Sequence, residues 1–423
     1  MAELVTPEPS IEAPAAEATM PNKSWLYLLC LSLSVMVGGL SSVCIKQLLL
    51  PIQAVQIAPL DKNTVLTLVA SIGAGAGLIA LPLVGALSDR TVLRSGRRRP
   101  WIALGIAVAV GGMCLMAFAH SIPLLLIGEI GAQTGVVAVL TVTTALLPDQ
   151  IPLSQRRFVA AYVGMAPNVG GVIGLVLVSL LTDTRVISQG YVLMAALSLV
   201  CVMLFLAVLE DPPVSHEEVP SFHLKSFLVS FVSPLRVRDF TLTLLSRCFA
   251  YLAFTILGTY TLFYVQDALH AINPATSVAN FQLLSTTVLL ACALFAGWLS
   301  RRVNRLKPFA IGGAMGMAIG LGVMALIPNW TGLFLTAILF GAGFGLFLGV
   351  DMALAVRVLP SAQARAKDLG IMYDAIYLSL IISPIIGGGL LNLFQNSFAL
   401  LFAVAALSSI LTSLLILPIK TVR

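Results

Sequence analysis

The sequence predicts an all-α membrane protein with 12 transmembrane helices, arranged as two related six-helix bundles. Apolar residues make up 59% of its 423 positions and charged residues only 10%, whereas a water-soluble domain usually carries about 25% charged residues. The apolar residues occur in long runs, and about 18 in a row span the hydrocarbon layer as one helix. The two halves of the chain also carry similar motifs in the same order, which predicts a duplicated unit.

The 12 apolar runs predict the spans in order along the chain. The first run follows Pro21 and Lys23 and is too long for a cleavable signal peptide, so we expect it to remain in the mature protein. The predicted limits are 25–48, 64–87, 101–119, 122–146, 158–181, 191–209, 240–265, 278–299, 308–327, 331–358, 370–393 and 397–417.

Basic residues gather on alternate connections between these spans. Of the 24 Lys and Arg residues, all but Lys46, Lys62, Arg185 and Arg247 fall on one predicted side of the membrane. The positive-inside rule makes that side cytoplasmic, so we expect both termini there. The net charge of +6 therefore reflects the orientation of the spans and does not indicate binding of nucleic acid. We expect a multi-pass protein of the plasma membrane that is embedded in the lipid bilayer.

Composition and repeats predict four regions. Residues 1–22 are rich in Ala, Glu and Pro and predict a disordered cytoplasmic tail. The N-terminal bundle is expected at 23–209, a cytoplasmic linker at 210–239 and the C-terminal bundle at 240–423. One chain then contains both bundles, so a monomer suffices for function.

Three motifs repeat between the halves. The segment that begins at Gly85 recurs at Gly297, and LLP at 146–148 recurs as VLP at 358–360, both with an offset of 212. PNVGG at 167–171 recurs as PIIGG at 384–388 with an offset of 217. Two six-helix units with all termini on one side are parallel repeats, related by an axis along the membrane normal.

The sequence shows no pattern typical of a metal, cofactor or catalytic site. The six cysteines lie inside predicted spans without CxxC spacing, and the four histidines lack metal-ligand spacing. No phosphate-binding GxxxxGK[ST] motif and no Ser/His/Asp or Cys/His set in an extramembrane segment is present. We therefore expect no metal and no cofactor, and a polytopic enzyme or receptor is disfavoured.

The connection after the second run carries the most specific motif. Gly85-x-Leu87-Ser88-Asp89-Arg90, followed by GRRRP at 96–100, resembles the cytoplasmic loop-two motif of the major facilitator superfamily. Helix count, duplication and motif position extend the resemblance over essentially the whole chain. It implies the major facilitator fold, with two pseudo-symmetric bundles that move a small-molecule solute by alternating access.

The same motif predicts a cytoplasmic gate. Asp89 can meet the positive end of a helix from the other half, or a nearby arginine, and hold that side closed. An alternative is a solvated charge cluster that only fixes orientation, and Arg301 replaces the acid in the second half. The candidate gate residues are Gly85, Asp89, Arg90, Gly96 and Arg97.

Four further segments narrow the resemblance. TYTLFYVQD at 259–267, VDMAL at 350–354, RAKDLG at 365–370 and GRRRPW at 96–101 resemble the sugar-transporter-like branch, with its sucrose–proton and glycoside–pentoside–hexuronide symporters. This implies proton-coupled import of a sugar or similar polar solute. APNVGG at 166–171 is similar to an element of drug–proton antiporters, so efflux of a drug or metabolite is the alternative. Since PIIGG repeats it, we interpret the element mainly as helix packing.

Ionisable residues inside predicted spans are candidates for proton coupling, because each costs several kcal/mol unless it is paired or lines water. The acidic candidates are Glu129, Asp351 and Asp374, and Arg247 can pair with either aspartate. Static pairing inside one bundle is the alternative for each. Lys46 lies near the predicted outer end of the first span, where we expect its side chain to reach the interface.

Two sets of side chains share a helix face with a candidate acid. Gln133 lies four residues after Glu129, and Tyr260 and Tyr264 precede Asp267 at helical spacing. The resemblance places spans one, four, seven and ten around a central cavity, which makes Gln133, Tyr260, Tyr264 and Asp267 candidates for solute contact. The tyrosines can equally be interfacial anchors.

Overall fold

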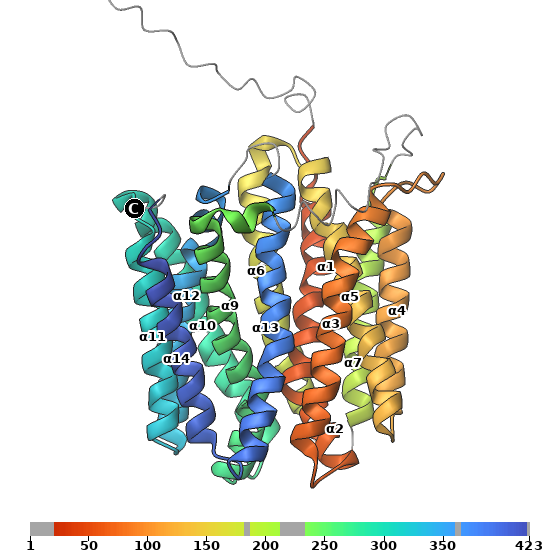
Figure 1. Cartoon of the computed structure of the whole chain (residues 1–423). Helices are drawn as coiled ribbons and strands as arrows, with labels where there is room; N and C mark the ends of the chain where they lie inside the picture. Colours follow the sequence, from red (N-terminus) through yellow and green to blue (C-terminus); the bar gives the residue numbers. More distant parts are fainter. Residues whose placement is uncertain (1–20, 182–186, 212–232, 360–364, 421–423) are drawn as a thin grey trace, which may run out of the picture.

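The computed structural model describes residues 21–181, 187–211, 233–359 and 365–420. It contains 12 helices long and apolar enough to span a membrane, so the predicted number is confirmed (Figure 1). Nearly all of the predicted tail, and residues 212–232 of the predicted linker, lie outside the described residues.

The N-terminal bundle begins where Ser24 caps the first helix by accepting a hydrogen bond from the amide of Tyr27. Its first span runs without a break through α1, the π-helix η2 and α2. The elements are α1 Trp25–Cys44, η2 Ile45–Leu49, α2 Leu50–Ile57, α3 Lys62–Ser88, α4 Arg99–Ala117, α5 Ile122–Gln150, α6 Leu153–Leu181 and α7 Ile187–Val208.

The C-terminal bundle follows a short 3₁₀ turn, and its first span also ends in a π-helix, η5. Pro274 and Pro308 each stand in the first turn of a helix, where a missing amide proton costs nothing. The elements are η4 Ser233–Arg236, α9 Arg238–Phe263, η5 Tyr264–Ala268, α10 Pro274–Val303, α11 Lys307–Leu326, α12 Trp330–Arg357, α13 Arg365–Leu393 and α14 Phe398–Ile416.

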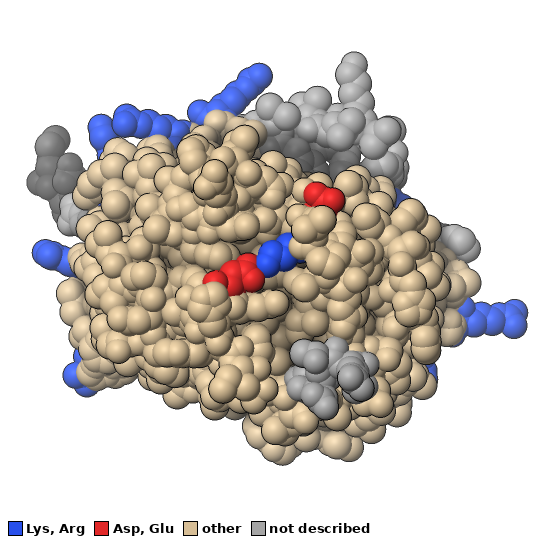
Figure 2. Space-filling view, turned by 90° about the horizontal axis from the view of Figure 1, so that it is seen from below, with Lys and Arg blue, Asp and Glu red and all other residues tan. Residues whose placement is uncertain are grey.

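The two ends of the helix array differ in charge. One end, which we call the basic end, holds the arginine-rich connections after α3 and α10 and lies at the top of Figure 1. The opposite, far end carries the short connections 58–61, 118–121, 269–273 and 394–397. Figure 2 shows this far face, where a basic and an acidic group touch near the centre and a further acidic group lies apart from them.

The first span is longer than predicted. The sequence prediction ended it at 48, but the helix continues to Ile57, and Gln53 in this stretch is packed inside the protein. Gln53 is 4% exposed and donates to the backbone oxygens of Met116 and Ala119. The helix also passes through Pro51 directly after the π-helix, which absorbs the change in hydrogen-bonding register.

The repeated Pro-Gly elements serve helix packing, as the sequence analysis favoured. A Cβ on Gly39 of α1 would collide with the backbone oxygen of Pro167 in α6, so only glycine permits this approach. In α13, a Cβ on Gly387 would collide with the ring of Tyr260, and one on Gly388 with the hydroxyl of Thr67. The first element therefore packs α1 against α6, and the second packs α13 against both bundles.

Hydrogen bonds that join the two bundles gather in the far-end half of α3 and α13. Thr67 donates to the backbone oxygen of Pro384 at 2.8 Å, and Ser71 to that of Ile381 at 3.0 Å. Nearer the far end, the amide of Asn63 donates to Asn392 at 3.1 Å and to Asn396 at 2.9 Å. Lys62 completes the row with an ion pair to Asp267 of η5 at 2.5 Å. These polar contacts hold the bundles together at the far end.

Candidate functional site

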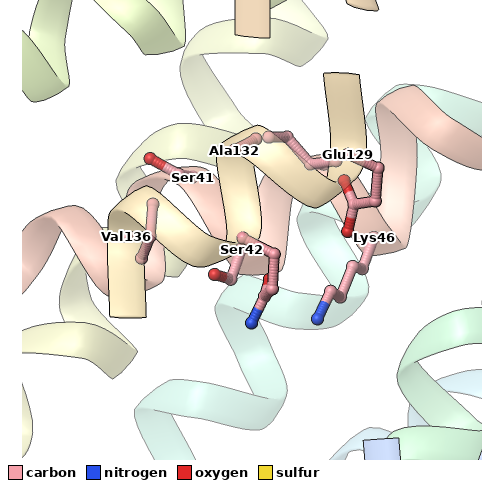
Figure 3. A pocket seen from close by; sticks show the side chains of 8 residues that line it. Ser41, Ser42, Lys46, Glu129, Ala132 and Val136 are labelled. Carbon is pink, nitrogen blue, oxygen red and sulfur yellow. The ribbon is translucent and has the colours of Figure 1, made fainter. Parts of the chain in front are cut away.

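A small pocket lies inside the N-terminal bundle, between the first span and α5. It holds about 180 Å³ of free space, including space open to solvent. Figure 3 shows Glu129 reaching it from α5 and Lys46 from the π-helix η2. We call it the Lys46–Glu129 pocket, and it is lined by Ser41, Ser42, Ile45, Lys46, Glu129, Ala132, Gln133 and Val136.

Glu129 is 1% exposed, and its Oε1 atom has no hydrogen-bond partner among the described residues. Gln133 lies one turn further along α5 and lines the same pocket, so the predicted common face of these two residues is confirmed. Glycines of α3 make room for both: a Cβ on Gly73 would lie 2.5 Å from Cγ of Glu129, and one on Gly77 would lie 3.1 Å from Cγ of Gln133.

The expectation that Lys46 reaches the membrane interface is wrong. Its side chain is 9% exposed and lines the pocket, and its Nζ has no hydrogen bond to any described residue. Because the helix continues to Ile57, Lys46 lies about 16 Å from its end at about 1.5 Å per residue, beyond the reach of a lysine side chain. Sequence reasoning named Lys46 but placed it at the interface because it ended the span too early. Gln47 and Gln53, which follow it and are buried, were the available signal.

The pocket therefore brings together a basic and an acidic group that the fold removes from water, with Nζ of Lys46 and Oε1 of Glu129 left without a hydrogen bond to any described residue. Such groups cost several kcal/mol each. An apolar pair of similar volume would pack here at lower cost. The arrangement is suited to a site that takes up a proton on the carboxylate, or a polar solute whose oxygen atoms accept hydrogen bonds from the ammonium.

A second buried charge pair lies in the C-terminal bundle. Arg247 of α9 and Asp351 of α12 are 2% and 4% exposed in their side chains, and Nη2 lies 3.1 Å from the carboxylate. The guanidinium also lies over the rings of Tyr251 and Tyr373, at 6.0 and 5.7 Å from their centroids. Of the two predicted partners, the structure joins Arg247 to Asp351.

Asp374 lies in α13 and is not part of this ion pair. Its side chain is half-buried, and its Oδ1 atom finds no hydrogen-bond partner in the part of the chain that the structure describes. Asp374 is thus a separate carboxylate of the C-terminal bundle, whereas the Lys46–Glu129 pocket lies in the N-terminal bundle.

The predicted common face of Tyr260, Tyr264 and Asp267 is not observed. Tyr260 donates to the backbone oxygen of Pro384 at 3.0 Å, whereas the ring of Tyr264 packs against Phe398 and Phe402 of α14. Asp267 pairs with Lys62 at the far end. The helix changes to π geometry at Tyr264, and the wider turn rotates the following side chains away from the expected direction.

The loop-two residues form a network inside the N-terminal bundle. Arg98 joins Asp89 at 2.6 Å and Asp149 at 3.0 Å, and Arg97 joins Asp149 at 2.8 Å. Of the two partners predicted for Asp89, it therefore contacts a nearby arginine in this conformation. Arg90 donates to the backbone oxygen of Ala86 at 2.9 Å.

Glycines of the same motif allow close approach. Gly96 has φ +98°, and a Cβ there would collide with Asp211. The carboxylate of Asp211 accepts from the amides of Arg98 and Arg99 at 2.6 and 2.8 Å, at the start of α4. Gly85 faces Thr141 of α5, whose Cγ2 would lie 3.7 Å from an added Cβ.

Comparison with known proteins agrees with this architecture. A sequence model of the Major Facilitator Superfamily matches residues 29–271 and 243–422. A general alpha-glucoside permease of Schizosaccharomyces pombe is 25% identical over 194 residues. That match covers 39% of this chain and 35% of the permease, so it spans about a third of that relative's length.

Solved structures share the fold over nearly the whole chain. A D-xylose–proton symporter superposes with a TM-score of 0.74 and 17% identity, covering 93% of this chain and 97% of its own. A nucleoside transporter gives 0.74 and 13% identity over 93% and 99% of the two chains. A peptide transporter gives 0.76 and 13% identity over 95% and 96%. The chain is a member of the major facilitator superfamily: a multi-pass membrane transporter, not an enzyme.

Proposed function

We propose that the chain carries a sugar or similar polar solute inward by proton-coupled alternating access. The observation that carries this proposal is the Lys46–Glu129 pocket, where the Lys46 ammonium and the Oε1 atom of the Glu129 carboxylate are buried without hydrogen bonds among the described residues. The similarity to an alpha-glucoside permease and to a D-xylose–proton symporter supports the solute class and the coupling ion.

Glu129 is the proposed proton carrier. While it is ionised, its negative charge compensates the ammonium of Lys46 across the pocket. When a proton neutralises Glu129, that compensation is lost, and the three N–H groups of Lys46 become available to oxygen atoms of a solute. Gln133 and Ser42 line the same pocket and can donate and accept further hydrogen bonds, which suits a polyhydroxylated solute.

The proposed orientation follows the distribution of charge. We assign the basic end to the cytoplasm, since Lys and Arg are enriched on cytoplasmic connections. The far end, which the contacts of α3 and α13 hold together, then faces outward. The conformation described here is therefore closed toward the outside and corresponds to the solute-release side of an import cycle.

The two ends carry proposed gates. At the far end, the ion pair of Lys62 and Asp267 joins the two bundles in this conformation. At the basic end, Asp89 is held by Arg98 within its own bundle, and its carboxylate is half-exposed. We propose that Asp89 forms the second gate: when the basic end closes, its carboxylate contacts the C-terminal bundle.

Drug efflux loses its main sequence support in this structure. The element around Pro167 that resembles drug–proton antiporters is accounted for by the close packing of α6 on α1. Charge pairs buried in both bundles suit a polar solute.

The test is uptake by proteoliposomes of the purified chain, across a panel of sugars, nucleosides, peptides and cationic dyes, with and without an inward proton gradient. We expect a sugar to accumulate above its external concentration only when the gradient is imposed. Accumulation that is indifferent to the gradient, or proton-driven extrusion of a dye without sugar uptake, contradicts the proposal.

A further inference from the structure

An open groove lies at the basic end of the C-terminal bundle, between α10 and α12. It holds about 750 Å³ of free space, including space open to solvent. Its walls come from the last turns of both helices and from the connection that follows α10. The lining residues are Gly297, Ser300, Arg301, Asn304, Leu306, Gly349, Ala353 and Arg357.

Two arginines from different helices give this groove its charge. Arg301 donates through Nε to the backbone oxygen of Gly297 at 2.8 Å, which fixes the base of its guanidinium at the rim. Arg357 reaches Asn304 from the opposite wall, with Nη2 and Oδ1 3.5 Å apart. The segment 297–309, from the end of α10 to the start of α11, contains no acidic residue. The acid nearest to Arg357 along α12 is Asp351, which is already paired with Arg247.

The N-terminal repeat provides an internal comparison. With the offset of 212, Arg301 occupies the position of Asp89. At the basic end of that bundle, the carboxylates of Asp89 and Asp149 neutralise Arg98. The C-terminal groove keeps the guanidinium groups but has no acid among its lining residues, so it presents positive charge without a counter-ion among the described residues.

Aromatic residues mark the depth of the groove in the membrane. Trp298, one turn before Arg302, is 47% exposed, and the guanidinium of Arg302 lies 4.5 Å from the centroid of its ring. Phe295 is also half-exposed on the same helix. Tryptophan beside basic side chains is typical of the level of lipid head groups. The groove is therefore at the height at which a membrane presents phosphate.

We propose that the groove between α10 and α12 binds an anionic phosphate group through Arg301 and Arg357. Guanidinium groups match phosphate oxygens with paired N–H donors, and two arginines from facing walls can hold one group between them. The group can come from an anionic phospholipid head group or from a dissolved phosphate ester. This site lies in the C-terminal bundle, apart from the Lys46–Glu129 pocket, and does not depend on the proposed solute.

The test uses the full chain, purified in neutral detergent, with native mass spectrometry and thermal stability as readouts. The probes are phosphatidylglycerol, phosphatidylcholine and soluble glycerol phosphate. We expect phosphatidylglycerol to bind and raise Tm more than phosphatidylcholine. Glycerol phosphate distinguishes the sources: if it competes with the lipid, the groove accepts a dissolved phosphate ester, and if it does not, the groove is specific for a head group in the membrane.

The variants are Arg301→Gln, Arg357→Gln and the double variant, with Arg302→Gln as the matched control outside the groove lining. Each groove variant should weaken binding about fivefold, the effect of about one basic side chain near an anionic surface. Arg301→Asp, which restores the acid of the N-terminal repeat, should weaken it further. All these side chains are exposed, so Tm without lipid should stay within a few degrees of wild type.

Two results overturn the proposal. One is equal binding of phosphatidylglycerol and phosphatidylcholine to the wild type, with no binding of glycerol phosphate. The other is a loss of binding in Arg302→Gln as large as that in the double groove variant, because the charge of this end as a whole would then attract the lipid.

Discussion

Each bundle buries a basic and an acidic side chain well inside its spans, but only one bundle joins them. In the C-terminal bundle, Arg247 and Asp351 form an ion pair at 3.1 Å beside two tyrosine rings. In the N-terminal bundle, Lys46 and Glu129 line one pocket, and Lys46 Nζ and Glu129 Oε1 have no hydrogen-bond partner among the described residues. Arg247 also leaves Nε and Nη1 without a hydrogen-bond partner among the described residues, so the bundles differ in whether their opposite charges are in contact. We interpret the joined pair as structural and the separated charges as the site that binds.

The two sites also differ in depth. Glu129 lies 7 residues from the far-end start of α5, and Arg247 lies 9 residues from the basic-end start of α9. The unsatisfied charges are therefore near the closed, far end, and the joined pair is near the basic end. A proton or solute that reaches Glu129 lies close to the contacts of α3 that hold the far end together.

The largest expected effect is that of Glu129→Gln. Removing the titratable group should abolish proton-driven accumulation, because the pocket can no longer take up a proton, while solute exchange at equal pH continues. Uptake and counterflow in proteoliposomes measure the two activities separately. Accumulation that still follows the pH gradient in this variant would remove Glu129 from the mechanism.

Asp351→Asn should act on stability. It leaves Arg247 buried without its counter-charge, a change that costs about 3–5 kcal/mol. A large drop in Tm of the purified chain is expected, whereas the double variant Arg247→Met, Asp351→Leu should recover most of it. If instead Asp351→Asn keeps the wild-type Tm and loses transport, the Arg247–Asp351 pair takes part in transport and its structural role is contradicted.

The glycines of α3 allow a graded test of the pocket geometry. Gly73→Ala places a Cβ 2.5 Å from Cγ of Glu129, Gly77→Ala places one 3.1 Å from Gln133, and Gly75→Ala meets nothing within 4 Å. We expect accumulation to fall most for Gly73→Ala, less for Gly77→Ala and not at all for Gly75→Ala. Equal losses in all three variants would indicate a general sensitivity of α3 to helix packing.

The smallest effects are expected at the proposed gates. The gate ion pairs lie at the ends of the bundles and are partly exposed. Ion pairs at a protein surface contribute about 0.2–1 kcal/mol, so each substitution should shift the conformational equilibrium by about fivefold. A thiol introduced at Ser42 can be labelled with a reagent added at the far end. Asp267→Asn loosens the far end and should raise this labelling. Asp89→Asn weakens closure of the basic end and should lower it. Shifts in the same direction would contradict opposing gates.

The sequence predicted the parts of this protein that depend on composition and repetition. Helix number, the duplicated halves and the common face of Glu129 and Gln133 follow from apolar runs and from helical periodicity. The Pro-Gly elements were also correctly interpreted as packing.

The errors arise where buried polar residues and π-helices alter the simple pattern. Gln53 lowers the apolar character of the first span, but its amide is satisfied by backbone oxygens inside the protein, so the helix continues and Lys46 is buried. A π-helix leaves no mark on hydrophobic periodicity, so the divergence of Tyr260 and Tyr264 was not predictable. Pairing of Arg247 with Asp351 rather than Asp374 depends on how α12 and α13 pack.

The central claim is that Glu129 carries the proton that drives solute movement. The most direct measurement is the external pH of weakly buffered proteoliposomes when solute is added at zero gradient, for wild type and Glu129→Gln side by side. Wild type should make the medium more alkaline as solute enters, and the variant should give no pH change. An equal alkaline shift in both would contradict the account.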